Sequence, residues 1–499
     1  MDERNQQKQL LRARGICVVI PTYNNAGTIV QVAQSTLAFC DDVIVVNDGS
    51  TDATTSLLQD LEGITLVHYT RNRGKGYALR QGFQKARELG FAYAITLDAD
   101  GQHYPEHIAD FLRANQEHPG ALIIGSRKLE GIQRSKGSDF ANAFSNFWFW
   151  VQTGRRLSDT QTGYRLYPIK KLHGLALLTS RYEAELELLV FSSWHGVELV
   201  EIPIEVYYPP MEERVSHFRP AADFTRISIL NTVLCFLAVV YGLPLRLLRF
   251  LGVWGRTLFS LLFFLVAWVL VMPFMWLDVK IMPFAQETKR EHVRQMMSGF
   301  ARLVMMYMGI PGTRFSYKKP ENLSFDQPRI VICNHQSHLD LMCQLVFSHK
   351  LTFLTNDWVW NSPLYGFLIH QAEYYPVSEG LEEMLPKLRS LVERGYSICV
   401  FPEGTRSKDC RIGRFHQGAF YLAEQMGLEV LPMYLYGPGR VLPKKTYHLN
   451  KGPVYIEVGE PITQSQLLAM GDHRQQASHM RRHYLQHYAE ICNRIEQEV

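Results

Sequence analysis

The stretch Ala92-Tyr93-Ala94-Ile95-Thr96-Leu97-Asp98-Ala99-Asp100 joins a short apolar run to a pair of carboxylates. Similar apolar runs at residues 16–20, 43–46, 64–68 and 121–124 alternate with segments that have helical spacing. Strands that alternate with helices in this way favour a parallel sheet covered on both faces. The sequence therefore predicts an α/β fold for the N-terminal half.

Polar residues gather where these strands end. The loop after the first strand contains Pro21 and Tyr23, the loop after the second contains Asp48, and Asp98 and Asp100 follow the fourth. Ligands of open α/β sheets bind at the carboxyl ends of the strands. We therefore expect these residues to bind one ligand.

The Asp98-Ala99-Asp100 motif has the chemistry of a metal site for a diphosphate. Two carboxylates one residue apart can bind a hard divalent cation, Mg or Mn, which neutralises phosphate charge. The turn Arg73-Gly74-Lys75-Gly76 opens a helix whose N–H groups, with Lys75, can meet phosphate. The alternatives are a solvated turn for the two carboxylates and an ordinary exposed lysine for Lys75.

Four motifs, at residues 21–24, 47–50, 73–76 and 98–102, resemble in their order those of glycosyltransferase family 2, and in particular the dolichyl-phosphate mannose synthases. The resemblance covers about residues 15–225. It implies a GT-A fold, inversion at the sugar carbon and a nucleotide-sugar donor bound by the residues just named, with Asp48 on the nucleobase side. Asp98 and Asp100 would flank the metal and the diphosphate.

The same resemblance extends to the acceptor side. Residues 159–165 resemble the acceptor loop of the family, which assigns Arg165 to acceptor binding. Residues 216–219 resemble a basic segment near the phosphates, which assigns Arg219. Relatives commonly have Lys where this chain has His217, so phosphate binding by this segment is the weaker assignment.

The catalytic base depends on the acceptor. A phosphate acceptor is already a nucleophile, whereas a hydroxyl needs a nearby carboxylate. Asp159 is the candidate base. Glu183 and Glu185 are further candidates, although an exposed helix face explains both.

The composition limits the classes of partner. The 499 residues include 52 Lys and Arg against 48 Asp and Glu, so no strong field attracts nucleic acid, and a membrane or a small molecule is the expected partner. The eight cysteines lack metal-ligand spacing and are expected to be reduced thiols. Residues 1–15 are charged rather than apolar, so we expect no secretory signal and a cytoplasmic N-terminus.

Two segments, residues 227–245 and 257–277, are nearly free of charge, and each is long enough to cross a bilayer as a helix. A hairpin of two spans would return both halves to one side, but it would place Arg246, Arg249 and Arg256 outside, against the positive-inside tendency. Re-entrant or interfacial helices avoid that conflict. Buried core helices are the third alternative.

Strand-like runs return in the C-terminal half, at residues 329–333, 351–354, 397–401, 430–436 and 454–458. Helical segments separate these runs. The alternation predicts a second α/β domain.

His335 and Asp340 form an H-x4-D motif in this half. Their spacing corresponds to about 140° around a helix, so His335 should precede the helix rather than share a face with Asp340. In one interpretation Ser337 and Asp340 form a capping box without chemistry. In the other, Asp340 orients His335, which takes a proton from an acceptor hydroxyl. His338 is expected to be a bystander.

The motif Phe401-Pro402-Glu403-Gly404-Thr405-Arg406-Ser407 follows another predicted strand. Gly404 permits close backbone approach, and Arg406 offers a planar fork for a phosphate. A plain surface turn is the alternative. Three segments, the H-x4-D motif, residues 401–407 and residues 430–432, together resemble the glycerolipid acyltransferases related to lysophosphatidic acid acyltransferase. The resemblance covers about residues 300–470.

This second resemblance implies direct acyl transfer from an acyl-coenzyme A or acyl carrier protein thioester, with no cofactor. It assigns acceptor binding and the shaping of the site to Glu403, Gly404, Thr405 and Arg406.

Two departures from the acyltransferase pattern concern the acceptor. The family's G-x-x-F-I-x-R element carries an Arg for the acceptor phosphate, and residues 366–377 lack it. The segment Phe415-His416-Gln417-Gly418-Ala419 replaces the usual basic F-K-x-G-A. The loss of both cations predicts an acceptor other than a simple lysophosphatidic acid, such as a glycosylated or an aromatic lipid.

The two halves together predict a bifunctional enzyme that transfers a sugar and an acyl group to a lipid-like acceptor. Residues 1–225 are assigned to the glycosyltransferase domain, 226–290 to a membrane-associated helical linker and 291–499 to the acyltransferase domain. We expect the protein at a bacterial-type inner membrane, with both domains facing the cytoplasm. The alternative is that one half alone is catalytic and the other binds lipid or membrane.

Overall fold

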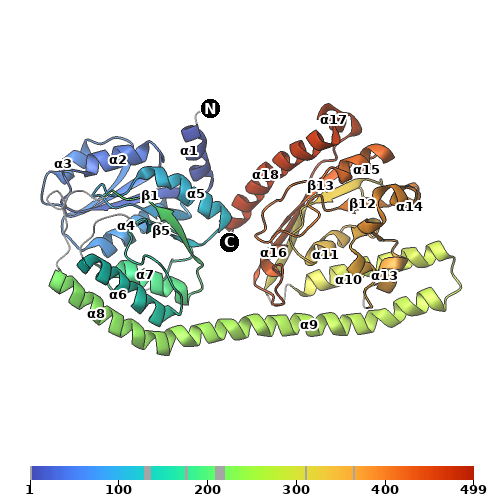
Figure 1. Cartoon of the computed structure of the whole chain (residues 1–499), viewed down its shortest axis with the longest axis horizontal. Helices are drawn as coiled ribbons and strands as arrows, with labels where there is room; N and C mark the ends of the chain where they lie inside the picture. The colour runs from blue at the N-terminus through green and yellow to red at the C-terminus, as the bar shows by residue number, and fades with distance from the viewer. Residues whose placement is uncertain are drawn as a thin grey trace. The chain divides into compact units, whose positions relative to one another are not determined.

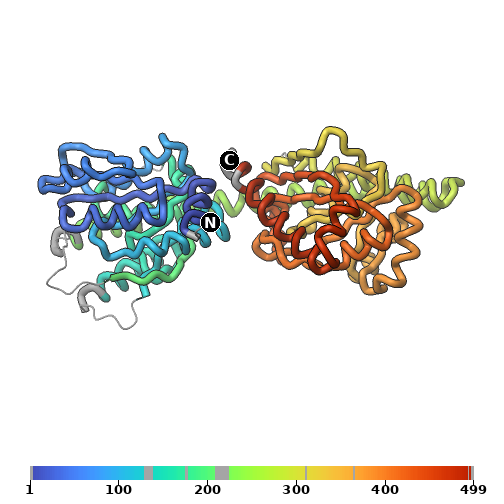
Figure 2. The backbone as a smooth tube through the Cα atoms, turned by 90° about the horizontal axis from the view of Figure 1, so that it is seen from above, coloured from blue at the N-terminus to red at the C-terminus, as the bar shows by residue number. Residues whose placement is uncertain are grey.

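The computed structural model describes residues 3–128, 136–174, 178–207, 220–308, 312–363 and 366–498. The chain divides into two compact units, Met1–Arg249 (unit 1) and Phe250–Val499 (unit 2), shown in Figure 1 and Figure 2. Each unit contains its own seven-stranded sheet.

Unit 1 has the strand order β3-β2-β1-β4-β6-β5-β7. Neighbouring strands are parallel except at β6, which runs antiparallel to both β4 and β5. The strands are β1 Ile16–Thr22, β2 Val43–Asp48, β3 Ile64–Tyr69, β4 Tyr93–Thr96, β5 Leu122–Arg127, β6 Arg165–Tyr167 and β7 Leu199–Ile204. The five strands predicted for this half are confirmed as β1 to β5.

Helices cover both faces of this sheet (Figure 1). One face packs against α1 Glu3–Ala13, α2 Ile29–Leu37, α3 Thr54–Gln59 and α5 Ile108–Glu117, which follows the short 3₁₀ helix Pro105–His107. The other face packs against α4 Lys75–Glu88, α6 Lys136–Thr153, α7 Glu183–Trp194 and α8 Pro220–Leu237. Alternate residues of each strand enter the two cores. Val18 belongs to one and Val19 to the other, as expected for a doubly covered strand.

Unit 2 has the strand order β11-β10-β12-β9-β13-β14-β8. Its strands are β8 Thr313–Lys318, β9 Ile330–Cys333, β10 Leu351–Thr355, β11 Tyr375–Pro376, β12 Ser397–Val400, β13 Val430–Tyr436 and β14 Gly452–Val458. β14 runs antiparallel to β13, and β8 pairs parallel with β14 at the edge. The predicted strands are confirmed as β9, β10, β12, β13 and β14, whereas β8 and the two-residue β11 were not predicted.

The sheet of unit 2 is also covered on both faces. One core includes side chains of α10 Gln286–Tyr307, α11 Leu339–Leu345 and α13 Gly366–Gln371. The opposite core includes α14 Leu381–Glu393, α15 Gly418–Met426, α17 Gln464–Ala469 and α18 His473–Glu498. The remaining short helices are α12 Asp357–Trp360, α16 Pro438–Val441 and the 3₁₀ turn Val377–Glu379.

The apolar segments form one helical stretch and not a hairpin. α8 continues through a π-helical segment, Ala238–Gly242, into α9 Leu243–Lys280. The hairpin alternative is therefore wrong. No turn is required at the arginines, because Arg246 and Arg249 donate to the carbonyls of Thr153 and Trp194, the last residues of α6 and α7. A cation at a helix C-terminus is stabilised by the helix dipole.

This stretch is long and apolar enough to cross a membrane, by length and composition. The core-helix alternative is wrong, because only 11% of its most apolar window is buried. At about 1.5 Å per residue, 57 residues of helix extend roughly 85 Å, far beyond a hydrocarbon core of about 30 Å. A membrane-embedded part can therefore include only a portion of the stretch.

Candidate active sites

The polar loops of unit 1 meet at the carboxyl edge of its sheet, around Lys75. This residue begins α4, and its Nζ lies 2.7 Å from Asp98 Oδ1 and 3.0 Å from Glu185 Oε2. Burial opposes the charge of Lys75, but the two carboxylates outweigh it and raise the pKa of the ammonium group. The interpretation of Lys75 as an ordinary exposed lysine is thus wrong.

Glu185 reaches this centre from α7, a helix in which every residue is buried. We expected an exposed helix face for Glu183 and Glu185, and that expectation is wrong. The reason is that α7 lies between α4, α6 and α8, so no face of it is left to solvent. The sequence signal that could have indicated this is the mainly apolar run from Leu186 to Trp194.

The two carboxylates of the Asp98-Ala99-Asp100 motif differ in their surroundings. Burial would raise the pKa of Asp98, but Lys75 and other nearby cations lower it. Burial, and then the charge of Asp98, raise the pKa of Asp100 to about 6. Carboxylates that repel each other in this way fit a divalent cation, which relieves the repulsion.

Glycine is required at position 163 by the packing of this centre. A Cβ atom there would lie 2.5 Å from Asp98 Oδ2 and 2.9 Å from Lys75 Nζ. The hydroxyl of Thr96 donates to the carbonyl of Gly163 at 2.6 Å and fixes the loop against β4. Gly163 therefore lets the loop before β6 approach the carboxylates closely.

Asp48 organises the turn that precedes Lys75. Its Oδ1 accepts from the backbone N–H of Arg73 at 2.8 Å, and its Oδ2 accepts from that of Gly74 at 2.7 Å. Asp48 is buried. A nucleotide-sugar that contacts Asp48 as predicted would do so while both carboxylate oxygens keep these hydrogen bonds. Pro21 lies in β1 opposite Val46, and Tyr23 follows that strand, so both sit at the same carboxyl edge.

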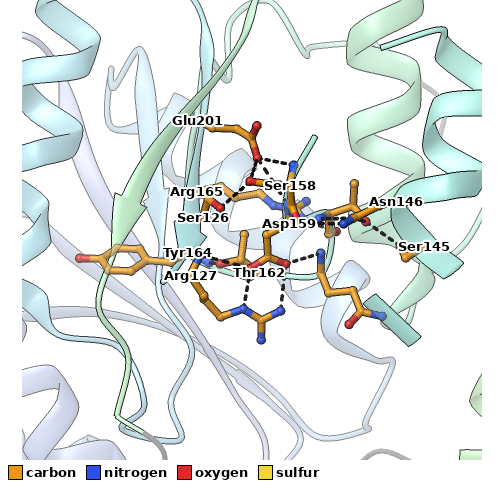
Figure 3. A network of polar contacts seen from close by, with 12 residues as sticks. Ser126, Arg127, Ser145, Asn146, Ser158, Asp159, Thr162, Tyr164, Arg165 and Glu201 are labelled. Carbon is orange, nitrogen blue, oxygen red and sulfur yellow. Dashed lines mark hydrogen bonds and ion pairs between the residues drawn. The ribbon is translucent and has the colours of Figure 1, made fainter. Parts of the chain in front are cut away.

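A second polar network surrounds Asp159, as Figure 3 shows. Arg127, at the end of β5, holds this carboxylate with two bonds, Nε to Oδ2 at 2.6 Å and Nη2 to Oδ1 at 2.9 Å. The backbone N–H of Gln161 also donates to Oδ1 at 3.1 Å. Burial would raise the pKa of Asp159, but the bonds from Arg127 lower it.

This geometry does not support Asp159 as the base. A buried carboxylate with a lowered pKa and both oxygens engaged is a weak proton acceptor. It serves instead to position Arg127, which sequence reasoning missed. The neighbours of Asp159 are anchored too, because Ser158 bonds to Glu201 and Ser126, and Thr160 bonds to Ser145 (Figure 3).

Arg165 is placed in the interior and not on an acceptor surface. It is fully buried, and its guanidinium donates to the carbonyls of Glu185 at 2.9 Å and Thr160 at 2.8 Å. The predicted acceptor contact is therefore corrected, since Arg165 fixes the loop from inside. Arg219, the other predicted acceptor cation, lies outside the described residues, as does His217.

His335 and Asp340 meet in unit 2 at the carboxyl end of β9. His335 Nδ1 lies 2.8 Å from Asp340 Oδ2, and that oxygen also accepts from the backbone N–H groups of Gln336 and Ser337. α11 begins at Leu339, so His335 precedes the helix as predicted. The capping box is wrong, because α11 has His338 as its N-cap without a side-chain bond, and the N–H of Asp340 donates to the carbonyl of Ser337 and not to its hydroxyl.

The imidazole of His335 is fixed on two further sides. It stacks on Phe401, with ring centroids 4.0 Å apart and an interplanar angle of 19°. Glu403 accepts from the backbone N–H of His335 at 2.9 Å and from that of Gly413 at 2.7 Å. Glu403 therefore joins the two loops that form the site, and the bond between Nδ1 and Asp340 leaves His335 Nε2 as the nitrogen for chemistry.

Cationic and imidazole groups lie around these loops. Lys444, which sequence reasoning missed, donates to Thr405 Oγ1 at 3.2 Å and to the carbonyl of Arg406. Gly404 has a φ of 66°, and a Cβ there would lie 3.8 Å from His416 Nε2. Burial, and then the charge of Arg406, lower the pKa of His338. His416 thus lies beside the predicted acceptor motif.

Two family models match the chain. Glycosyl transferase family 2 matches residues 17–166, and Acyltransferase matches residues 314–436. A polyprenol monophosphomannose synthase of Mycolicibacterium smegmatis is 30% identical over 204 residues, which are 38% of this chain and 75% of that protein. The N-terminal half belongs to glycosyl transferase family 2. The C-terminal half carries an acyltransferase domain.

Two further relatives match one half each. A UDP-N-acetylglucosamine–dolichyl-phosphate N-acetylglucosaminyltransferase of Methanococcus voltae is 28% identical over 39% of this chain and 86% of that protein. A chloroplastic 1-acyl-sn-glycerol-3-phosphate acyltransferase of Brassica napus is 34% identical over 28% of this chain. The match spans less than half, 43%, of that plant enzyme.

The segment of the acyltransferase domain that lacks the family's arginine contains a buried ion-pair cluster. Glu373 accepts from Arg290 at 2.9 Å, from Arg294 at 2.6 Å and from Arg394 at 3.0 Å. Arg294 is 1% exposed and stacks over Tyr396. Arg290 and Arg294 tie α10 to the turn before β11, and Arg394 ties the end of α14 to the same turn, so these arginines serve the fold.

Asp159→Asn in the glycosyltransferase domain is expected to lower the stability of unit 1 by about 2–3 kcal/mol, because it removes the carboxylate that holds the mostly buried Arg127 with two charged bonds. The folded-state pKa of Asp159 is lowered, so the pair stabilises the fold above the unfolded pKa and loses this effect as the pH falls through the folded pKa. Amide hydrogen exchange of β5 and β6 should therefore differ between wild type and variant at pH 7 and converge in acid. A constant difference down to pH 2 would contradict the assignment.

Glu403→Gln in the acyltransferase domain is expected to lower kcat for acyl transfer about 10- to 100-fold and to leave the acceptor KM within about threefold. An amide can accept only one of the two N–H bonds, so the His335 loop loses its anchor. Steady-state kinetics with varied acceptor measures this, and Glu382→Gln on the exposed face of α14 is the matched control. A rise in KM at constant kcat would show instead that Glu403 binds the acceptor.

Proposed function

We propose that the chain is a bifunctional enzyme of lipid biosynthesis that transfers a sugar from a nucleotide-sugar and an acyl group from a thioester to a lipid-like acceptor. The observation that carries this proposal is that both sites keep their chemical groups in working geometry. Lys75 bridges Asp98 and Glu185 in one domain, and Asp340 orients His335 in the other.

The glycosyltransferase site is suited to a nucleotide-sugar. Pro21, Tyr23 and Asp48 provide the edge of the sheet where the donor would bind. Held by Asp98 and Asp100, Mg or Mn would neutralise the diphosphate of the leaving nucleotide. Lys75 offers a permanent positive charge beside that position, and the acceptor would attack from the opposite side of the sugar carbon, with inversion.

Arg127 is the residue that we assign to the acceptor side of this site. Its side chain is held by Asp159 in one orientation at the end of β5. Asp159 occupies the Nε and Nη2 edge of this guanidinium, so Arg127 would contribute a fixed positive charge, and not a bidentate fork, toward a phosphate on a lipid carrier. A phosphate nucleophile requires no base, which agrees with the engaged state of Asp159.

The acyltransferase site supports a direct transfer. His335 Nε2 would take the proton of an acceptor hydroxyl while Asp340 stabilises the imidazolium ion. The hydroxyl oxygen then attacks the thioester carbonyl, the C–O bond forms and the C–S bond breaks. The leaving thiolate receives the proton from His335. Acyl-coenzyme A and acyl carrier protein both supply such a thioester.

The acceptor that we propose is a glycosylated lipid rather than a simple lysophosphatidic acid. His416 stands beside Gly404 where the family pattern has Lys, and the turn before β11 uses its charges in the Glu373 cluster. Thr405 and Arg406 remain available to orient the acceptor, with Lys444 against the same loop. An acceptor that carries a sugar would link the two activities.

The apolar helix supports the membrane location that we propose. Large apolar side chains of α9 are exposed, including Leu248 at 66%, Leu258 at 67% and Phe274 at 68%. Such a surface is stable only against lipid or a protein partner. We propose an inner membrane of bacterial type, in which the apolar helix lies in the interface and does not cross the bilayer. Both catalytic domains then stay on the cytoplasmic side, where nucleotide-sugars and acyl thioesters are made.

Mass spectrometry of lipid extracts tests the proposed function. Cells that express the wild-type chain are compared with cells that carry an empty vector. We expect new lipids whose masses include one sugar residue and one added acyl chain. The absence of any lipid that depends on expression would refute the proposal.

A further inference from the structure

A basic pocket lies beside the edge strand β8, outside the residues of the acyl-transfer site. The cavity has a volume of about 1000 Å³ and is formed by unit 2 alone, from α10, β8, β14 and the end of α18. Four of its lining residues are cations: Arg302, Arg314, Lys318 and Arg494. None of the described residues that line it is acidic.

One carboxylate next to the pocket, that of Glu457, neutralises only part of its positive charge. Glu457 pairs with Arg494 and lies 3.8 Å from Lys318. Arg302 donates from Nε to the carbonyl of Val346 at 3.0 Å, and within the described part of the chain no ion pair joins Arg302 or Arg314 to a carboxylate. The pocket thus presents an excess of positive charge.

The remaining walls of the pocket are apolar. Met305, Met306, Phe315 and Ile495 contribute to the lining, and Met306 is 67% exposed. A site with several cations and an apolar wall favours a ligand that has both phosphate groups and an uncharged part. Inorganic ions alone would not use the apolar wall.

The strand register places this pocket toward the catalytic edge of the sheet. Cys333 pairs with Met433, Tyr436 with Tyr455, and Pro453 with Arg314. Counted along β13 and β14, the row that contains Arg314 lies beyond the end of β9, on the side of His335. With strands about 4.8 Å apart and residues about 3.3 Å along each strand, Arg314 is roughly 17 Å from His335.

We infer that this pocket receives the phosphate end of the acyl donor, whose phosphopantetheine arm then reaches to His335. This inference rests on the proposed acyl transfer and adds the place where its donor binds. An extended phosphopantetheine arm spans a distance of this order. Coenzyme A and the acyl carrier protein share this arm and its phosphate, and both carry further negative charge that complements the four cations.

The test is equilibrium binding, which requires no turnover. Coenzyme A, 3′-dephospho-coenzyme A and phosphopantetheinylated carrier protein are titrated into the full-length chain and into Arg314→Glu. The control is Arg482→Glu, an equal charge change at an exposed position of α18 outside the pocket. We expect Arg314→Glu to weaken binding of coenzyme A or carrier protein at least about tenfold, and the control to change it less than twofold.

The donors distinguish the two sources of the shared phosphate. A loss for both coenzyme A and its dephospho form that spares the carrier protein assigns the pocket to the nucleotide end of coenzyme A, and a larger loss for the carrier protein assigns it to that protein. A loss confined to coenzyme A and absent for the dephospho form would leave only the 3′-phosphate in the pocket and would overturn the inference. Arg314→Gln, which removes the charge without reversing it, should give a smaller loss. Binding within twofold of wild type for all ligands would overturn the inference, as would weakened binding to phosphatidylglycerol vesicles alone.

Kinetics separates this inference from the proposed function. An acyl-N-acetylcysteamine thioester has no phosphate, so its KM should be the same for wild type and Arg314→Glu. If wild type transfers acyl groups from no thioester at all, the proposed acyl transfer fails, and the binding data still decide whether the pocket holds the phosphopantetheine ligand.

Discussion

Replacing His335 with Ala is expected to lower acyl transfer about 10³-fold and to leave sugar transfer unchanged. The variant removes the only imidazole that Asp340 orients among the described residues, and general base catalysis contributes about 10²- to 10⁴-fold. Initial rates with an acyl thioester and a lipid extract measure the effect. Sugar incorporation by the same preparation shows that the glycosyltransferase domain is intact.

His338→Ala is the matched control for this prediction. It removes an exposed imidazole three residues away and should change acyl transfer less than about threefold. Equal losses in the two variants would mean that the loop rather than His335 is sensitive. Full acyl transfer by His335→Ala would remove the basis for the acyltransferase assignment.

The double change Asp98→Ala and Asp100→Ala is expected to reduce sugar transfer at least about 10³-fold. It removes the carboxylates that fit a divalent cation, and it also leaves Lys75 with Glu185 as its remaining acidic partner. Electrostatic stabilisation of a leaving group is usually among the largest contributions to a transfer reaction. Radiolabelled sugar incorporation into lipid measures the loss, and acyl transfer should persist when glycosylated lipid from a wild-type reaction is supplied.

The chain offers a matched control with the same spacing. Asp60→Ala with Glu62→Ala removes two carboxylates one residue apart on the exposed turn after α3, and sugar transfer should remain within about twofold of wild type. A similar loss in both double variants would point to net charge instead of the site. Sugar transfer that survives the Asp98 and Asp100 changes would contradict the metal assignment.

Much of the fold could be predicted because the strands are short, apolar and separated by helical segments. Two strands that were not predicted, β6 and β8, have no apolar run of their own. β6 contains Arg165 and lies in a loop motif, so its antiparallel pairing depends on β4 and β5 and not on its own pattern. β8 is an edge strand with mostly exposed residues, so it carries no apolar run.

The residues of the candidate sites also differ in whether the sequence could predict their contacts. The pair His335 and Asp340 could be predicted because both residues lie in one short motif. The partners that come from distant segments could not. Glu185 reaches Lys75 across more than a hundred residues, and Arg127 finds Asp159 only because β5 and the loop before β6 are neighbours in the sheet.

Composition alone could not predict that the apolar segments form one continuous helix. The three arginines between its two segments left a hairpin, re-entrant or interfacial helices and core helices all open. Two of these arginines are used to bind the C-terminal carbonyls of α6 and α7, which lie far away in the sequence. Only the folded structure shows that these charges serve unit 1 and allow the helix to continue.

A bifunctional enzyme of the proposed kind adds both groups to one lipid. The most direct test incubates the full-length chain with a lipid extract, a tritiated acyl thioester and a panel of ¹⁴C-labelled nucleotide-sugars, and separates the products by chromatography. We predict one lipid that carries both labels with the wild-type chain. His335→Ala should lose only tritium, and the Asp98 and Asp100 double variant should lose both labels, because the proposed acceptor of acyl transfer is the glycosylated lipid. Two labels that always reside in separate lipids would contradict the account.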